Sequence, residues 1–110
     1  MRIYIDVSGT LIGNPYVPAA EALQLVQDAS EAGHDVRLVS ADPDHARSLI
    51  PGIEALDKQD VVLAAREYGV DRCLWVDDDE HVLACVARMG AHTLHAGHLR
   101  GLLASAGKVA

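Results

Sequence analysis

The feature that most constrains the fold is a short apolar run ending in a carboxylate, which occurs twice. Residues 3–5 lead directly into Asp6. The continuous apolar segment 73–76 leads in the same way into Asp77. Such runs are typical of strands buried on both faces, as in parallel sheets covered by helices. Open α/β sheets bind ligands at the carboxyl ends of their strands, so Asp6 and Asp77 are expected at a ligand-binding edge.

Helical patterns alternate with further extended ones. Strands are predicted at residues 2–5, 36–39, 73–76 and 92–94. Helices are predicted at residues 18–32, from 42 to just before 51, 59–68, 79–90 and 99–104, while 50–57 has no clear assignment. Val82, Leu83 and Val86 are expected to face inward. The alternation predicts an α/β, Rossmann-like three-layer sandwich with a mostly parallel sheet of about four to five strands.

Composition sets the outer limits. The chain has 110 residues, which suits a single domain spanning 1–110. Phe is absent and aromatics are scarce, so Ala, Val and Leu are expected to fill the core. A net charge of −7 argues against nucleic acid or an anionic membrane as a partner. No signal peptide or membrane-length run is evident, so a cytoplasmic protein is expected, with Cys73 and Cys85 as buried, reduced thiols.

Polar and acidic residues follow three predicted strands: Asp6, Ser40 and the run 77–80. Four adjacent acids repel one another, and hard oxygen ligands suit Mg²⁺. The alternative is helix capping, with Asp79 as the N-cap and Glu80 in the first turn. Capping leaves the acids at 77 and 78 unexplained, so the pattern favours a metal site.

Ser40 and Lys58 are weaker candidates. A hydroxyl followed by the strong helix start Asp42-Pro43 is suited to cradle a phosphate, although turn chemistry alone can place a serine there. A lone lysine before a helix is usually a solvated surface charge. Lys58 is a candidate because a site formed by Asp6 and the acids at 77–80 would need a cation to balance the charge of an incoming phosphoryl group.

Two segments resemble motifs of the haloacid dehalogenase-like (HAD) hydrolases. The run from Asp6 to Leu11 reads D-x-S-G-T-L, similar to the family's motif I, D-x-D-G-T-L. Val76-Asp77-Asp78 and the segment to Leu94 are similar to motif IV, Ser40 matches motif II, and Lys58 is the candidate for motif III. The resemblance covers essentially the whole chain and implies a minimal member with no cap domain.

The resemblance implies a role for each matched residue. Asp6 would be the nucleophile that forms an aspartyl-phosphate. Mg²⁺ would be held by Asp6, the backbone carbonyl of Ser8 and Asp78, with Asp77 secondary. The phosphoryl group would contact the loop Ser8-Gly9-Thr10, together with Ser40 and Lys58.

Two departures from the family pattern bear on activity. Ser8 replaces the second Asp of motif I, which normally protonates the leaving group and activates water. Losing such a general acid and base slows a reaction by roughly 10²–10⁴-fold. Val82 stands where many members carry Asp or Asn. Two hypotheses follow: a slow phosphohydrolase or phosphotransferase acting on a small phosphorylated molecule or an activated phosphate, or a catalytically inactive module that binds a ligand or a protein.

Other readings are less favoured. A response-regulator receiver domain needs an acid pair after its first strand, where this chain has Asp6 alone. His92, His95 and His98 recur at three-residue steps, but surface histidines are a better explanation than a zinc site. A site without a cap is open, so a protein partner or a second copy could cover it.

Overall fold

The computed structural model describes residues 1–108, with side chains as far as Leu103. Its centre is a five-stranded, all-parallel sheet in the order β3-β2-β1-β4-β5. The strands are β1 (Arg2–Asp6), β2 (Asp35–Ser40), β3 (Ala55–Asp57), β4 (Cys73–Asp77) and β5 (His92–His95). The helices are α1 (Ala19–Glu31), α2 (Pro43–Leu49), α3 (Val61–Tyr68), α4 (Glu80–Arg88) and α5 (Leu99–Lys108).

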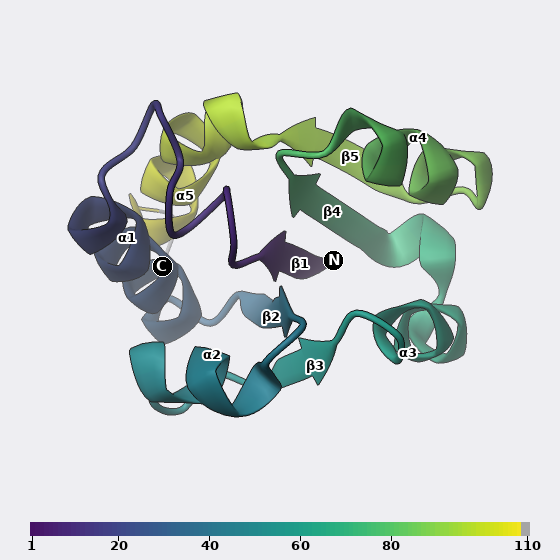
Figure 1. Ribbon diagram of the computed structural model, residues 1–110, viewed down its shortest axis with the longest axis horizontal. Coiled ribbons are helices and arrows are strands. Elements are labelled where there is room, and N and C mark those ends of the chain that lie inside the picture. Colours follow the sequence, from purple (N-terminus) through teal and green to yellow (C-terminus); the bar gives the residue numbers. More distant parts are fainter. Residues whose placement is uncertain (109–110) are drawn as a thin grey trace.

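Helices cover both faces of the sheet, which confirms the predicted three-layer α/β architecture. Figure 1 shows α1, α2 and α5 on one side of the strands and α3 and α4 on the other. Each side has its own apolar cluster. One joins Ile5 and Leu38 of the sheet to Val26 of α1 and to residues of α2 and α5. The other includes Tyr4 and Trp75 beneath α3 and α4, with ring centroids 4.9 Å apart.

Two helix starts follow from local sequence. The side chain of Asp42 accepts a hydrogen bond from the backbone N–H of His45 at 3.1 Å, with Pro43 as the first residue of α2. The side chain of Asp79 accepts one from the N–H of His81 at 2.8 Å and starts α4. Both caps lie just after strand ends, so they fix how each strand turns into its helix.

The structure differs from the sequence predictions in four places. The unassigned segment contains β3, a three-residue strand that pairs with β2 at the edge of the sheet. The helix predicted from residue 59 begins at Val61, because the N–H of Gln59 bonds to the Asp57 side chain and closes a turn instead. The last helix runs beyond residue 104, to Lys108.

The fourth difference concerns α4. Leu83 and Val86 are buried as predicted, but Val82, which was also expected to face inward, is 36% exposed. Cys85, expected to be a buried thiol, is exposed, while Cys73 is buried. Among the described residues, no helix combines the length and apolar character required to cross a bilayer.

Candidate metal and phosphate site

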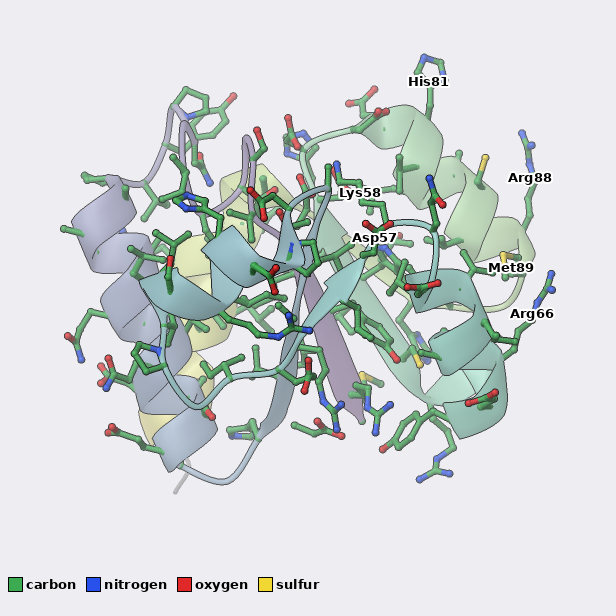
Figure 2. All side chains as sticks on the ribbon, turned by 60° about the horizontal axis from the view of Figure 1, so that its bottom comes forward. Asp57, Lys58, Arg66, His81, Arg88 and Met89 are labelled. Carbon is green, nitrogen blue, oxygen red and sulfur yellow. The ribbon has the colours of Figure 1, made fainter. Side chains whose placement is uncertain are left out.

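The parallel sheet brings the predicted site residues to its carboxyl edge. Asp6 ends the central strand β1, and the neighbouring pair Ile5 and Val76 puts Asp77, the next residue of β4, beside it. Ser40 ends β2 on the other side. Lys58 directly follows β3, and Figure 2 shows it with Asp57 at the end of that strand.

Three carboxylates converge at this edge. Each of Asp6, Asp77 and Asp78 offers an oxygen, and the three oxygens lie within 4.8 Å of one another. In the described part of the chain this is the one group of three or more His, Cys, Asp or Glu side chains so placed. Asp77 Oδ1 also accepts a hydrogen bond from the N–H of Asp79 at 2.9 Å. Capping therefore accounts for Asp79 but leaves these three acids together.

Asp6 is the most deeply buried of the three, with 2% of the residue exposed. Its Oδ1 accepts no well-aligned hydrogen bond from the described residues. The nearest cation is Lys58, whose Nζ lies 3.2 Å away as an ion pair. This ion pair partly compensates the charge of the buried carboxylate, because buried charges are stable only when they are paired.

Burial and neighbouring charges shift the pKa values of Asp6, Asp77 and Lys58. Burial, reinforced by the negative charge of Asp77, raises the pKa of Asp6 from its ordinary value of 3.8 to about 7, although Lys58 opposes the shift. Burial also raises the pKa of Asp77, with Asp78 adding to the effect. Burial alone would lower the pKa of Lys58, but its attraction to Asp6 outweighs this and the pKa is raised. A divalent cation would relieve the repulsion among these carboxylates.

Gly9 allows Asp78 to approach the loop that follows β1. Its φ of +85° lies in the left-handed region, and a Cβ at this position would collide with the Asp78 carboxylate. The chain then folds back, with the N–H groups of Leu11 and Ile12 both donating to the carbonyl of Val7 at 2.9 Å. The glycine of the motif is therefore needed for both backbone conformation and space.

Asn14 is a positioning residue that the sequence analysis did not single out. Its buried side-chain amide donates to the carbonyl of Thr10 at 3.0 Å and to that of Ala96 at 3.1 Å. Its oxygen accepts from the N–H of Tyr16 at 2.8 Å. These bonds fix the loop after β1 to the segment after β5. An asparagine one residue after the left-handed Gly13 is a local signal for such a turn.

The structure shows no hydrogen bond between Asp6 and the remaining phosphate-binding candidates, Ser40, Ser8 and Thr10, among the interactions of the described residues. The Ser40 hydroxyl donates to the carbonyl of Asp42 at 3.1 Å and accepts from its N–H at 3.0 Å, so it closes the turn before α2. Ser8 is exposed on the loop. The Thr10 hydroxyl is fully buried and has no hydrogen-bond partner among the described residues.

The histidines do not form a cluster of ligands. His92 and His95 belong to β5, and His98 lies in the following short turn, Ala96–His98. His95 Nδ1 accepts a hydrogen bond from the N–H of Gly97 at 3.0 Å. This bond closes the short turn that follows β5.

Comparison of the chain with protein-family models, curated proteins and solved structures gave no significant match. The resemblance to HAD hydrolases therefore stays an expectation based on the motif residues.

Proposed function

We propose that this protein transfers phosphoryl groups through an aspartyl-phosphate on Asp6, in a reaction that depends on Mg²⁺. The observation that supports the proposal is the burial of the Asp6 carboxylate beside a cation. This carboxylate is buried at the end of the central strand, and its Oδ1 forms an ion pair with the Lys58 ammonium at 3.2 Å. The carboxylates of Asp77 and Asp78 each bring an oxygen within 4.8 Å of an Asp6 oxygen.

The metal would be held by Asp6 and Asp78, with Asp77 adjacent and the Ser8 carbonyl as a further oxygen. Three carboxylates with few other ligands match the preference of Mg²⁺ for oxygen and for retained waters. Bound there, Mg²⁺ would supply positive charge against the oxygens of the transferring phosphoryl group.

The chain's own residues carry the reaction in two steps. An Asp6 oxygen forms a bond to phosphorus while the bond from phosphorus to the leaving group breaks, and the leaving group departs with the electron pair. Lys58 neutralises charge between Asp6 and the phosphoryl group. The Ser40 hydroxyl can turn from the Asp42 carbonyl to donate to a phosphoryl oxygen. Attack by water on phosphorus then releases inorganic phosphate and restores Asp6.

Ser8 limits the rate of this cycle. A serine hydroxyl cannot protonate an alkoxide leaving group or activate water near neutral pH. Substrates with good leaving groups, such as acyl phosphates, are therefore favoured for the first step. The second step is expected to be slow, so the aspartyl-phosphate should accumulate.

The second candidate is a binding module without turnover, and Ser8 is the observation that favours it. The same carboxylates and Lys58 could hold a cation and an anionic ligand or a protein without any bond to Asp6. The two functions differ in one measurable respect, because only the first makes a covalent bond.

The test is phosphorylation of wild type and Asp6→Asn with acetyl phosphate and Mg²⁺, read by intact mass, with p-nitrophenyl phosphate turnover measured in parallel. We expect an adduct of one phosphoryl group on wild type, absent from Asp6→Asn and from wild type in EDTA. Asp60→Asn is the matched control, because Asp60 is exposed and caps no helix through its side chain. If wild type shows neither adduct nor turnover, the binding module replaces the enzyme.

A further inference from the structure

A groove between α3 and α4 opens directly beside the candidate site. It has a volume of about 340 Å³. Val39 and Trp75 of the sheet form its floor, and Lys58 and Asp77 line it where it meets the carboxyl edge. This volume lies within the range typical of small-molecule pockets, roughly 300–1,000 Å³. The groove therefore shares Asp77 with the carboxylate cluster, and it also contains Lys58, the ion-pair partner of Asp6.

The walls of the groove are apolar and come from both helices. Val62 lines it from α3, and Val82 and Cys85 line it from α4, together with Met89 and the polar side chain of His81. Two short helices cover this face of the sheet, whereas three cover the other. The gap between α3 and α4 explains why Val82 is 36% exposed although the helical pattern predicts an inward position.

Two charged side chains line the groove, the cation Lys58 and the carboxylate Asp77. Lys58 lies at the end nearest Asp6. Figure 2 shows Arg66 of α3 and Arg88 of α4 on one side of the molecule, with Met89 between them. Neither arginine forms an ion pair or a hydrogen bond with the described residues, whereas Arg2, Arg47 and others are all paired. Neither arginine lines the groove, so Lys58 is the cation placed to meet an anionic group there.

We infer that this groove binds the apolar body of an organic phosphate whose phosphoryl group contacts Asp6 and Lys58. The inference rests on the proposed function and names its substrate class: acyl phosphates that carry a small aromatic or short aliphatic group. A sugar or nucleoside would leave its hydroxyls without partners against Trp75 and the valines. Burial of hydrocarbon there would contribute about fourfold in affinity for each methylene.

Trp75 and Cys85 allow binding to be measured without turnover. Trp75 is the sole tryptophan of the chain, so its fluorescence reports on the floor of the groove. Methyl-, butyl- and benzylphosphonate serve as probes in the presence of Mg²⁺, because phosphonates cannot transfer their phosphoryl group. We expect butyl- and benzylphosphonate to bind at least tenfold more tightly than methylphosphonate. Both should also slow alkylation of the exposed Cys85, whereas Cys73 is buried throughout.

Met89→Gln and Leu63→Gln form a matched pair of variants. Both replace an apolar side chain with glutamine, but Met89 lines the groove and Leu63 is 61% exposed on α3 outside it. Met89→Gln should weaken butylphosphonate binding several-fold and leave methylphosphonate binding unchanged. Leu63→Gln should change neither.

Three outcomes would overturn the inference. If acetyl phosphate still labels Asp6 but butylphosphonate binds no more tightly than methylphosphonate, the groove is not a substrate site and the proposed function stands. If no probe binds and no label forms, both fail together. If sedimentation shows a dimer with Cys85 protected in the absence of any probe, the groove belongs to a second copy of the chain.

Discussion

Replacing Asp6 with asparagine is expected to stabilise the metal-free protein at pH 8. The pKa of Asp6 rises from 3.8 to about 7 in the folded state, so its ionisation opposes folding at alkaline pH. A shift of this size corresponds to about 4 kcal/mol as an upper figure, at about 1.4 kcal/mol per pKa unit. Lys58 loses its partner in the variant, at little cost because its side chain is 52% exposed and reaches water. We therefore expect a net gain of about 2 kcal/mol in the free energy of unfolding.

The difference in stability between wild type and Asp6→Asn should depend on pH. Between pH 4 and pH 7 the folded wild type keeps the Asp6 proton that the unfolded chain releases. Wild-type stability therefore falls over this interval relative to the variant, and the full deficit is present above pH 7. Urea unfolding in EDTA at pH 5, 6.5 and 8 measures the difference. Asp60→Asn, which removes an exposed carboxylate, should show no comparable trend.

Mg²⁺ should reverse the order of stability. At 100 times its dissociation constant, a ligand that binds the folded state alone adds about 2.7 kcal/mol. Wild type should gain this stabilisation at pH 8, and Asp6→Asn should gain much less because a ligand is missing. Equal stability of the two proteins at every pH, with or without Mg²⁺, would refute the assignment of Asp6 as a strained, buried carboxylate.

Three further substitutions test the surroundings of Asp6. Gly9→Ala should lower the free energy of unfolding by about 1–2 kcal/mol, because alanine is strained in the left-handed conformation of this residue. It should also weaken Mg²⁺ binding, measured by calorimetry, because the added methyl group displaces the Asp78 carboxylate. Asn14→Ala should lower the free energy of unfolding in urea by about 1–3 kcal/mol, since it leaves buried backbone groups unpaired. Ser8→Asp should speed phosphate release from the labelled protein by roughly 10²–10⁴-fold, and an unchanged rate would show that the general base is not what is missing.

The sequence predicts the central part of the site well. Asp6 and Asp77 each end a short apolar run, and that local pattern is enough to place both at the carboxyl edge of neighbouring parallel strands. The caps at Asp42 and Asp79 are equally local, because each needs only the residues of the next helical turn.

Lys58 shows where local pattern is insufficient. Its place beside Asp6 depends on β3, which has three residues and no hydrophobic period of its own. This strand exists because it pairs with β2, a contact made by residues far apart in the chain. A sequence motif can nominate the lysine, but the position of its ammonium is decided by sheet pairing.

The groove was not predictable for a related reason. Periodicity in α4 identifies the apolar residues but not which of them meets a neighbour, so Val82 was expected in the core and is exposed instead. The distance between α3 and α4 depends on how each helix packs on the sheet, and that packing is a property of the whole fold.

Two features that oppose folding lie side by side in this protein. The carboxylates of Asp6, Asp77 and Asp78 repel one another at a partly buried edge, and the adjoining groove leaves apolar surface beside Trp75 uncovered. Single substitutions could remove either feature: asparagine at position 6 relieves the charge, and a larger side chain at Val82 would fill part of the groove. Neither the repulsion nor the open groove increases the stability of the folded protein, and features that oppose folding are expected at functional sites. Their contact through Lys58 therefore favours one bound molecule, with a charged head at the carboxylates and an apolar body between the helices.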